Sequence, residues 1–325
     1  MFPETRLRRL RQSAGIRDML AQPLPGPEKM IWPAFVMGGT NQREAIESMP
    51  GQSRLSTDQL LCDLEPIVQS GIGGVLLFGL VEDSEKDAVG SAAYQEDGTV
   101  QRTIRAVKKE FPDLVVTADV CVCAYTTHGH CGPLTDSGEV ANDAANEILA
   151  KIALSYAAAG ADMVAPSAMM DGQVQAIRSA LDANNFTQTL LMSYSTKFAS
   201  AMYGPFRDAE KSAPGKGDRK GYQAAYGDLR TALRESEFDE AEGADILMVK
   251  PSLFYLDLLS KIRESTDLPL AAYNVSGEYA MLHATADRGW GDLRAMVQES
   301  TVAQVRAGAD ILITYWANQY DALFR

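Results

Sequence analysis

The sequence has few cysteines and histidines, and its cysteines are not spread along the chain. Among 325 residues there are four cysteines and three histidines. Three of the cysteines lie within the eleven-residue segment CVCAYTTHGHC, residues 121–131. Such bunching does not resemble the spaced disulfide framework of a small secreted domain. We therefore expect reduced thiols and a cytoplasmic location.

The sequence also lacks an excess of positive charge and any long apolar run. Its formal net charge is -13, and a negative mean field repels the phosphates of nucleic acids and acidic membranes. No apolar run reaches the roughly 18 residues of a membrane span, and the first twenty residues lack the apolar middle of a signal peptide. We expect a small-molecule partner, with no nucleic acid and no membrane.

Helix and strand signals alternate along the chain. Three segments share a small-residue helix end, the triplet Gly-Ala-Asp and an apolar run; they are residues 157–166, 241–251 and 306–316. Each predicts a helix, a glycine turn and a buried strand. Five other apolar runs bring the expected strands to eight; they are residues 33–37, 74–80, 114–120, 189–194 and 268–274.

Eight strands alternating with helices predict an α/β fold, a single (β/α)8 TIM barrel over residues 31–325 with its active site at the carboxyl ends of the strands. A doubly wound open sheet is the alternative, but no Gly-x-Gly-x-x-Gly follows the first expected strand. Two segments stand outside the alternation. Residues 1–30 are expected to form an N-terminal arm that packs on a neighbouring subunit. The polar loop at about 200–223 is expected to be a lid, or else a loose surface loop.

Unusual polar residues follow the expected strands: Asp119, Ser167, Lys197, Lys250, Ser276 and Tyr315. Lys250 comes directly after the apolar run ILMV, where burial favours the neutral amine. A neutral amine can attack a ketone or an aldehyde and form a Schiff base. A salt bridge is the alternative for a single lysine at such a position, and the second lysine, Lys197, weakens that alternative.

The cysteine segment predicts a metal site. In an extended backbone Cys121 and Cys123 point to the same side, and Cys131 can return through a glycine-containing turn. Three thiolates favour zinc and leave one tetrahedral position open, as in catalytic sites. A fourth ligand from His128 or His130 would instead make the site structural, or these histidines would orient the other groups. Thiols without a metal are the remaining alternative.

The expected lid carries an island of basic residues in an acidic protein: Arg207, Lys211, Lys216, Arg219 and Lys220. Its natural guest is a carboxylate, and the planar guanidinium groups of Arg207 and Arg219 suit a carboxylate better than lysine does. The hydroxyls of Ser276 and Tyr315 can hold a second carboxylate, or they can make ordinary hydrogen bonds of the core.

Six stretches, taken together, resemble the porphobilinogen synthase (delta-aminolevulinic acid dehydratase) family. They are TADVCVCAYTTHGHCG (117–132), APSAMMDGQVQAIR (165–178), MSYSTKFASAMYGPFRDA (192–209), GDRKGYQ (217–223), LMVKPSLFYLD (247–257) and NVSGEYAM (274–281). The resemblance implies a barrel whose arm wraps a neighbouring subunit, usually in a homo-octamer. It also implies a lyase that condenses two molecules of 5-aminolevulinate to porphobilinogen, with loss of two waters, in tetrapyrrole synthesis.

The resemblance implies a role for individual residues. Lys250 and Lys197 match the lysines that hold the propionate-side and acetate-side substrates as Schiff bases. The lid residues that match the acetate-side carboxylate contacts are Arg207, Arg219 and Gln223. The residues expected to contact substrate on the other side are Tyr273, Ser276 and Tyr315. Three cysteines (Cys121, Cys123 and Cys131) match the ligands of the catalytic Zn²⁺. Asp119 and Ser167 are expected to position amines and protons.

Glu235, in LRES (233–236), stands where some members bind an allosteric Mg²⁺, although a plain helix-surface glutamate is the alternative. Two departures from the family pattern concern the arm and the lid: Leu7 replaces a common proline, and QAAYGDLR (223–230) lacks the asparagine-rich pattern. A class I aldolase would explain Lys250 but leave the cysteines and Lys197 without a role. A zinc-stabilised binding barrel without activity is the alternative outside the enzymes.

Overall fold

A computed structural model describes residues 3–210, 212, 215 and 217–325 of the chain. Its core is a ring of parallel strands: β1 (Met30–Met37), β4 (Gly74–Gly79), β5 (Val115–Val120), β6 (Met163–Pro166), β7 (Leu190–Lys197), β8 (Ile246–Lys250), β9 (Leu270–Asn274) and β10 (Ile311–Thr314). The ring closes because β1 pairs with β10 as well as with β4, with Met30 opposite Leu312. The predicted (β/α)8 barrel is confirmed, and the open sheet is wrong because the first and last strands pair with each other.

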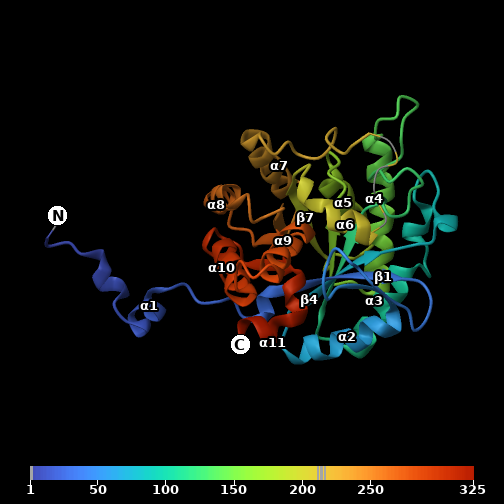
Figure 1. Cartoon of the computed structure of the whole chain (residues 1–325). Helices are drawn as coiled ribbons and strands as arrows, with labels where there is room; N and C mark the ends of the chain where they lie inside the picture. Colours follow the sequence, from blue (N-terminus) through green and yellow to red (C-terminus); the bar gives the residue numbers. More distant parts are fainter. Residues whose placement is uncertain (1–2, 211, 213–214, 216) are drawn as a thin grey trace.

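Helices surround the barrel (Figure 1). They are α2 (Thr57–Gln69), α3 (Thr99–Glu110), α4 (Asn142–Ala159), α5 (Gln173–Ala183), α7 (Leu229–Ala241), α8 (Leu256–Ser265), α9 (Ser276–Asp287), α10 (Leu293–Arg306) and the short α11 (Tyr320–Phe324). Their apolar residues recur at helical spacing; in α3 the buried residues include Val100, Ile104 and Val107. This spacing gives the helix one apolar face, which packs on the strands.

The three Gly-Ala-Asp triplets join neighbouring strands at the amino ends of the barrel. Each glycine, at 160, 243 and 308, has a positive φ, which a residue without a side chain adopts at little cost after a helix. Each aspartate then forms two hydrogen bonds with the preceding strand. In the second triplet the backbone N–H of Asp245 donates to Leu191 O over 2.9 Å, and Leu191 N–H donates to the Asp245 carboxylate over 2.7 Å. Asp162 and Asp310 make the same pair of bonds with Val116 and Leu270.

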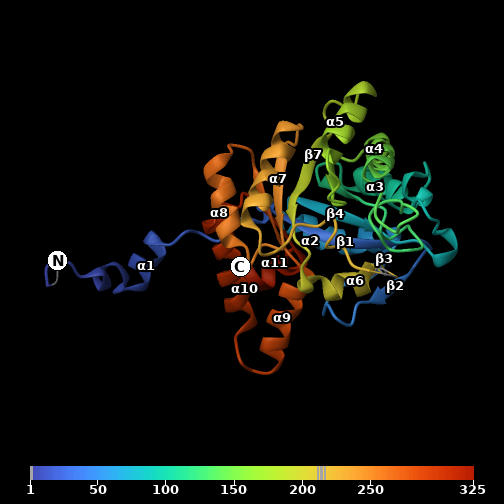
Figure 2. The ribbon, with the colours of Figure 1, turned by 90° about the horizontal axis from the view of Figure 1, so that it is seen from above.

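A short antiparallel pair, β2 (Arg43–Ala45) and β3 (Ser53–Ser56), was not predicted. Its segments REA and SRLS contain no apolar run, so they give no strand signal in the sequence. β3 pairs in parallel with the last part of β1, with Phe35 opposite Arg54. This addition lies beside the short helix α6 (Gly204–Glu210), as Figure 2 shows.

The first part of the chain extends away from the barrel (Figures 1 and 2). It contains a 3-10 turn (Leu7–Arg11) and α1 (Ala14–Leu20), and neither has a buried residue. Leu7 is 68% exposed and Met19 83% exposed. In the part of the chain that the structure describes, no helix is both long enough and apolar enough to span a membrane.

The aspartate of the second triplet should matter more to stability than a surface carboxylate. We expect Asp245→Ala to lower the free energy of unfolding by about 1–3 kcal/mol, because the buried Leu191 N–H loses its acceptor. Urea unfolding followed by circular dichroism measures this. Asp182→Ala is a matched control. Asp182 also pairs with Arg178, and its side chain is 52% exposed against 41% for Asp245, but within the described residues its carboxylate accepts from no strand N–H. Equal losses in the two variants would contradict the role given to Asp245.

Candidate active site

Two buried lysines end neighbouring strands of the barrel. Lys197 is the last residue of β7 and Lys250 the last of β8, and the strand register places them opposite each other. Both side chains are buried. The predicted position of the lysines at the carboxyl ends of the strands is therefore confirmed, and the charge of Lys197 acts on Lys250.

Aromatic rings surround the amine of Lys250. Its Nζ lies 4.1 Å from the ring centre of Tyr273, 4.7 Å from that of Phe206 and 4.9 Å from that of Tyr194. Among the described residues no carboxylate forms a salt bridge with it, so the salt-bridge alternative is wrong. Burial, followed by the charge of Lys197, lowers the pKa of Lys250 to about 7. Close to neutral pH a large fraction of this amine is therefore nucleophilic.

Lys197 lies among polar groups. Its Nζ donates to the backbone O of Ser167 over 2.6 Å. The hydroxyl of Ser167 in turn donates to Asp119 Oδ2 over 3.1 Å. Burial raises the pKa of Asp119 to about 6, although the charge of Lys197 opposes the rise. The structure thus brings Asp119, Ser167 and both lysines together at neighbouring strand ends, as expected.

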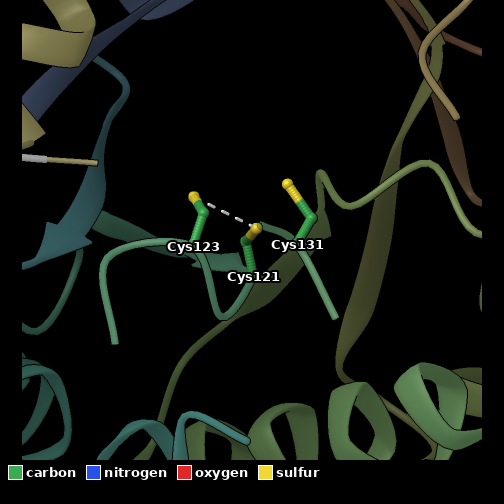
Figure 3. Close-up of side chains that lie close together, drawn as sticks. All are labelled: Cys121, Cys123 and Cys131. Carbon is green, nitrogen blue, oxygen red and sulfur yellow. Dashed lines mark hydrogen bonds between the residues drawn. The ribbon is translucent and has the colours of Figure 1, made fainter. Parts of the chain in front are cut away.

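The three cysteines of the 121–131 segment gather at the end of β5 (Figure 3). Their sulfur atoms all lie within 4.8 Å of one another, and all three residues are buried. Cys121 Sγ donates to Cys123 Sγ over 3.4 Å. None of the chain's four cysteines forms a disulfide.

The backbone at the cysteines is not the extended one that we expected. β5 ends at Val120, and Tyr125 N–H and Thr126 N–H both donate to Val122 O, which folds the segment into a turn. The turn still directs Cys121 and Cys123 to the same place. Cys131 returns through Gly129, whose φ of 72° suits glycine.

The two histidines of the segment stand outside the sulfur cluster. His128 Nε2 lies 3.1 Å from Ala88 O, and its Nδ1 accepts from His130 N–H, so hydrogen bonds occupy both ring nitrogens. His130 Nδ1 lies 3.2 Å from the hydroxyl of Tyr222. Neither histidine belongs to the metal-binding group found among the described residues. As arranged, these residues hold the loop in place.

The sulfur cluster fits a soft metal ion. Three converging sulfurs without a disulfide provide the donor set of a zinc site, and a tetrahedral ion on three ligands keeps one position open. Hydrogen bonds from Cys121 and Cys123 hold the pKa of Cys131 well below its usual value, and the charge of Arg219 adds to this effect.

Three residues of the segment expected to form a lid have polar atoms without partners. Among the described residues, Arg207 Nε, Arg219 Nε and both amide atoms of Gln223 are buried without a hydrogen bond. Arg219 Nη2 donates to Gly129 O over 3.0 Å, which joins the lid to the cysteine loop. Buried donors of this kind need an acceptor, and a carboxylate has the right shape and charge. Lys211 and Lys216 lie outside the described residues.

The opposite side of the pocket already has internal partners. Ser276 Oγ accepts from Phe206 N–H over 2.9 Å, so a backbone group of α6 occupies it. The hydroxyls of Tyr273 and Tyr315 lie 3.4 Å apart, and both rings are buried. Of these residues Tyr273 contacts the amine of Lys250, and Tyr315 reaches it through Tyr273.

Glu235 lies on α7. It lines a cavity of about 680 Å³ together with Asp171, Asp228, Tyr222 and also Gln223, whereas neither Lys197 nor Lys250 lines it. Burial and then the charge of Asp171 raise the pKa of Glu235. A helix-surface glutamate in open solvent would not be affected in this way.

The sequence reasoning missed several residues of this pocket. Phe206, Tyr194 and Tyr203 form part of the wall around Lys250. Glu210 is buried beside Cys123. Arg54 donates to two backbone oxygens of α6. The aromatic residues resemble ordinary core in the sequence, and Arg54 lies far from the lid along the chain. Glu210 could have been noticed in the sequence, because it is an acidic residue within a basic segment.

Comparison with known proteins agrees with this arrangement. A family model described as delta-aminolevulinic acid dehydratase matches residues 4–323. The delta-aminolevulinic acid dehydratase of Methanothermobacter thermautotrophicus is 51% identical over 318 residues, which cover 97% of this chain and 96% of the relative. That of Escherichia coli is 49% identical over 312 residues, covering 96% and 95%.

A solved structure is also closely similar. It is the delta-aminolevulinic acid dehydratase (porphobilinogen synthase) of Toxoplasma gondii in complex with the reaction product porphobilinogen. The TM-score is 0.95 at 45% sequence identity, and the match covers 97% of this chain and 90% of that one. The chain therefore belongs to the delta-aminolevulinic acid dehydratase family, whose members are lyases.

Proposed function

We propose that this chain condenses two molecules of 5-aminolevulinate to porphobilinogen through Schiff bases on Lys250 and Lys197, beside a zinc ion on Cys121, Cys123 and Cys131. The observation that carries the assignment of the residues is the pairing of two buried lysines at adjacent strand ends, next to a cluster of three sulfurs. An aldolase needs one such lysine and no sulfur cluster. The test of the function is formation of porphobilinogen from 5-aminolevulinate by the purified protein.

The chemistry uses each lysine as a nucleophile and then as a leaving group. Each amine adds to the ketone of one substrate and one water leaves, which gives two imines and accounts for the two waters lost. Loss of a proton beside the imine on Lys197 gives an enamine, whose carbon bonds to the imine carbon on Lys250. The free amino group of the substrate held on Lys250 then adds to the imine carbon on Lys197. Both lysines leave, and a final proton loss makes the ring aromatic.

Other residues bind and orient the two substrates. Arg207, Arg219 and Gln223 bind the carboxylate of the acetate-side substrate with their unpaired donors. Ser276, Tyr315 and Tyr273 contact the propionate-side substrate. Asp119 and Ser167, bonded to each other, hold an ammonium group and pass protons. When bound, zinc supplies a Lewis acid that polarises a carbonyl oxygen.

The assembly and the second metal belong to the same proposal. The exposed leucines and methionine of residues 3–24 are the apolar surface with which the arm packs on a neighbouring subunit, in a homo-oligomer that we take to be an octamer. Residues 200–223 act as a lid over the pocket. Glu235 binds an allosteric Mg²⁺, supported by the acidic cavity around it. The three reduced cysteines fit a cytoplasmic enzyme.

Borohydride should trap the imine at Lys250. We expect 5-aminolevulinate plus sodium borohydride to inactivate the wild-type protein and to add one reduced substrate to a peptide that contains Lys250, as measured by mass spectrometry. Lys250→Arg should abolish both the label on this peptide and the activity. The control Lys261→Arg changes a lysine on the outer helix α8 and should be trapped like the wild type. A full label on this peptide in the Lys250→Arg variant would contradict the assignment.

The rate of trapping should follow the pKa of Lys250. Because that pKa is lowered to about 7, the neutral amine prevails above pH 7 and is lost below it. We expect the rate to be level above pH 7 and to fall about tenfold for each pH unit below it. Lys197→Gln removes the charge that helps to lower this pKa, so the inflection should move to higher pH. A wild-type inflection near that of a free lysine would show that the amine is not desolvated.

Removal of the metal should abolish turnover. We expect a chelator to remove about one zinc per chain and the activity with it, and added zinc to restore both, because the open position of a three-thiolate site is catalytic. Cys131→Ser should lower zinc content and activity together. Cys62→Ser is the matched control, since Cys62 is free and exposed on α2. Full activity of the zinc-free protein would be consistent with the lysine chemistry but would contradict the catalytic role given to the metal.

A further inference from the structure

A buried carboxylate joins the segments that follow two neighbouring strands. Glu278 is the third residue of α9, and its side chain is buried. Its Oε2 accepts from Val275 N–H over 2.9 Å and from Asn274 Nδ2 over 3.1 Å, at the end of β9. Its Oε1 accepts from Leu253 N–H over 2.9 Å. Leu253 lies three residues after Lys250, so one side chain binds the segments beyond both β8 and β9.

Both of these segments belong to the surroundings of the Lys250 amine. The first continues directly from Lys250, the last residue of β8. The second lies between Tyr273, whose ring centre is 4.1 Å from Lys250 Nζ, and Ser276, to which the proposed function assigns a substrate contact. The amine and the groups expected to contact its substrate therefore stand on two separate segments, and Glu278 is bonded to both.

The first turn of α9 also contacts the segment expected to form the lid. Ser276 Oγ accepts from Phe206 N–H over 2.9 Å and donates to Met202 O over 3.4 Å. Gly277 allows this close approach, because a Cβ at that position would lie only 2.4 Å from Met202 O. Phe206 is itself part of the aromatic wall, with its ring centre 4.7 Å from Lys250 Nζ. The position of this turn therefore affects the wall as well as the two strand ends.

A carboxylate suits this junction better than a neutral side chain. Hydrogen bonds to a charged acceptor are stronger than those between neutral groups, and N–H donors from two segments converge on Glu278. Among the described residues no lysine, arginine or histidine forms a salt bridge with it. Burial raises the pKa of Glu278 to about 7, while hydrogen bonds from Val275, Leu253 and Asn274 oppose the rise. Above pH 7 the carboxylate form therefore prevails.

We propose that Glu278 is a positioning residue for the reaction at Lys250: it holds the segments after β8 and β9 together, which keeps the amine inside its aromatic wall and close to the groups that contact the same substrate. The inference rests on the role of Lys250 proposed above and adds the residue that holds this amine in place. Glu278 acts through Lys250 and does not itself react. Fixing a reactive group in this way lowers the cost of reaching the productive geometry.

The test compares Glu278→Gln and Glu278→Asp with wild type, by borohydride trapping of 5-aminolevulinate at Lys250 over a series of pH values. Glutamine keeps the length of the side chain but loses its charge and one acceptor, whereas aspartate keeps the charge but is too short to reach both segments. We expect both variants to be trapped at least about tenfold more slowly than wild type above pH 7, because a small displacement of a reactive group is costly.

Asp292→Asn is the matched control. Asp292 precedes the next helix, α10, and its exposed carboxylate accepts from Ala295 N–H over 2.8 Å, so it also binds a helix start but joins no strand ends there. We expect this variant to be trapped at the wild-type rate. A loss as large as that of the Glu278 variants would show that any weakened helix start slows trapping, and would overturn the inference.

The direction of the pH shift separates position from charge. Loss of a negative charge by itself disfavours a nearby ammonium group, so it would move the inflection of the trapping rate in Glu278→Gln to lower pH. A loosened wall lets water reach Lys250, so it moves the inflection of both variants to higher pH, toward that of a free lysine. We expect the upward shift. An inflection that stays in place or falls in either variant would overturn the inference.

The wild-type protein shows whether the proposed function itself stands. If wild type is not trapped at Lys250, both the role of that lysine and this inference are overturned, whereas a trapped wild type with unaffected Glu278 variants overturns this inference alone. If the variants fail to fold, as judged by circular dichroism, amide hydrogen exchange of the wild type decides. We expect the N–H groups of Leu253 and Val275 to exchange at least about tenfold more slowly than in a free peptide, and to slow further together after trapping. Exchange of either group at the free-peptide rate, or unchanged by trapping, would overturn the inference.

Discussion

The chemistry of this barrel depends on holding an amine out of water. The Nζ of Lys250 lies near several aromatic rings and forms no salt bridge with a carboxylate of the described residues, so burial disfavours its charged form. The rest of the site follows from this constraint. The parallel register of β7 and β8 adds the charge of Lys197, and Phe206 of α6 completes the wall from the side of the lid.

The amino ends of the strands contribute to stability, and the carboxyl ends carry the reactive groups. At the amino ends of the strands, the aspartates of the three Gly-Ala-Asp triplets satisfy backbone donors of neighbouring strands. At the carboxyl ends, Asp119, Arg219 and Gln223 each have buried polar atoms without an internal partner. Satisfied groups make a rigid frame, and unsatisfied groups are available to a ligand. Because the frame is rigid, the unpaired groups stay in position to meet a substrate.

The pocket also concentrates opposite charges at short range. The charges of Lys197, Asp119 and Glu210 act on Lys250, and those of Arg219 and Lys197 act on Cys131. In a medium of low polarity each of these groups affects the protonation of the others, which is why the charge of Lys197 opposes the raised pKa of Asp119 and also lowers the pKa of Lys250. Substrates that carry a carboxylate and an ammonium group complement this arrangement.

The amino-acid sequence by itself determined the barrel and its chemical groups. The apolar runs and the repeated Gly-Ala-Asp triplets mark the strands, since burial on both faces leaves an uninterrupted apolar signal. Lys197, Lys250 and the three cysteines stand out because their residue types are rare at strand ends. The extended backbone expected at Cys121–Cys123 was wrong, because a turn around Val122 O depends on local hydrogen bonds that the residue pattern does not reveal.

Only the tertiary structure decided which distant groups meet. The aromatic wall of Lys250, the approach of Glu210 to Cys123 and the hold of Arg54 on α6 join segments that lie far apart in the chain. No periodicity in the sequence encodes such contacts, because they arise from closure of the ring between β1 and β10 and from the packing of α6 beside it. The residue types therefore determine which chemistry is possible, and burial sets the pKa values and the partners of these residues.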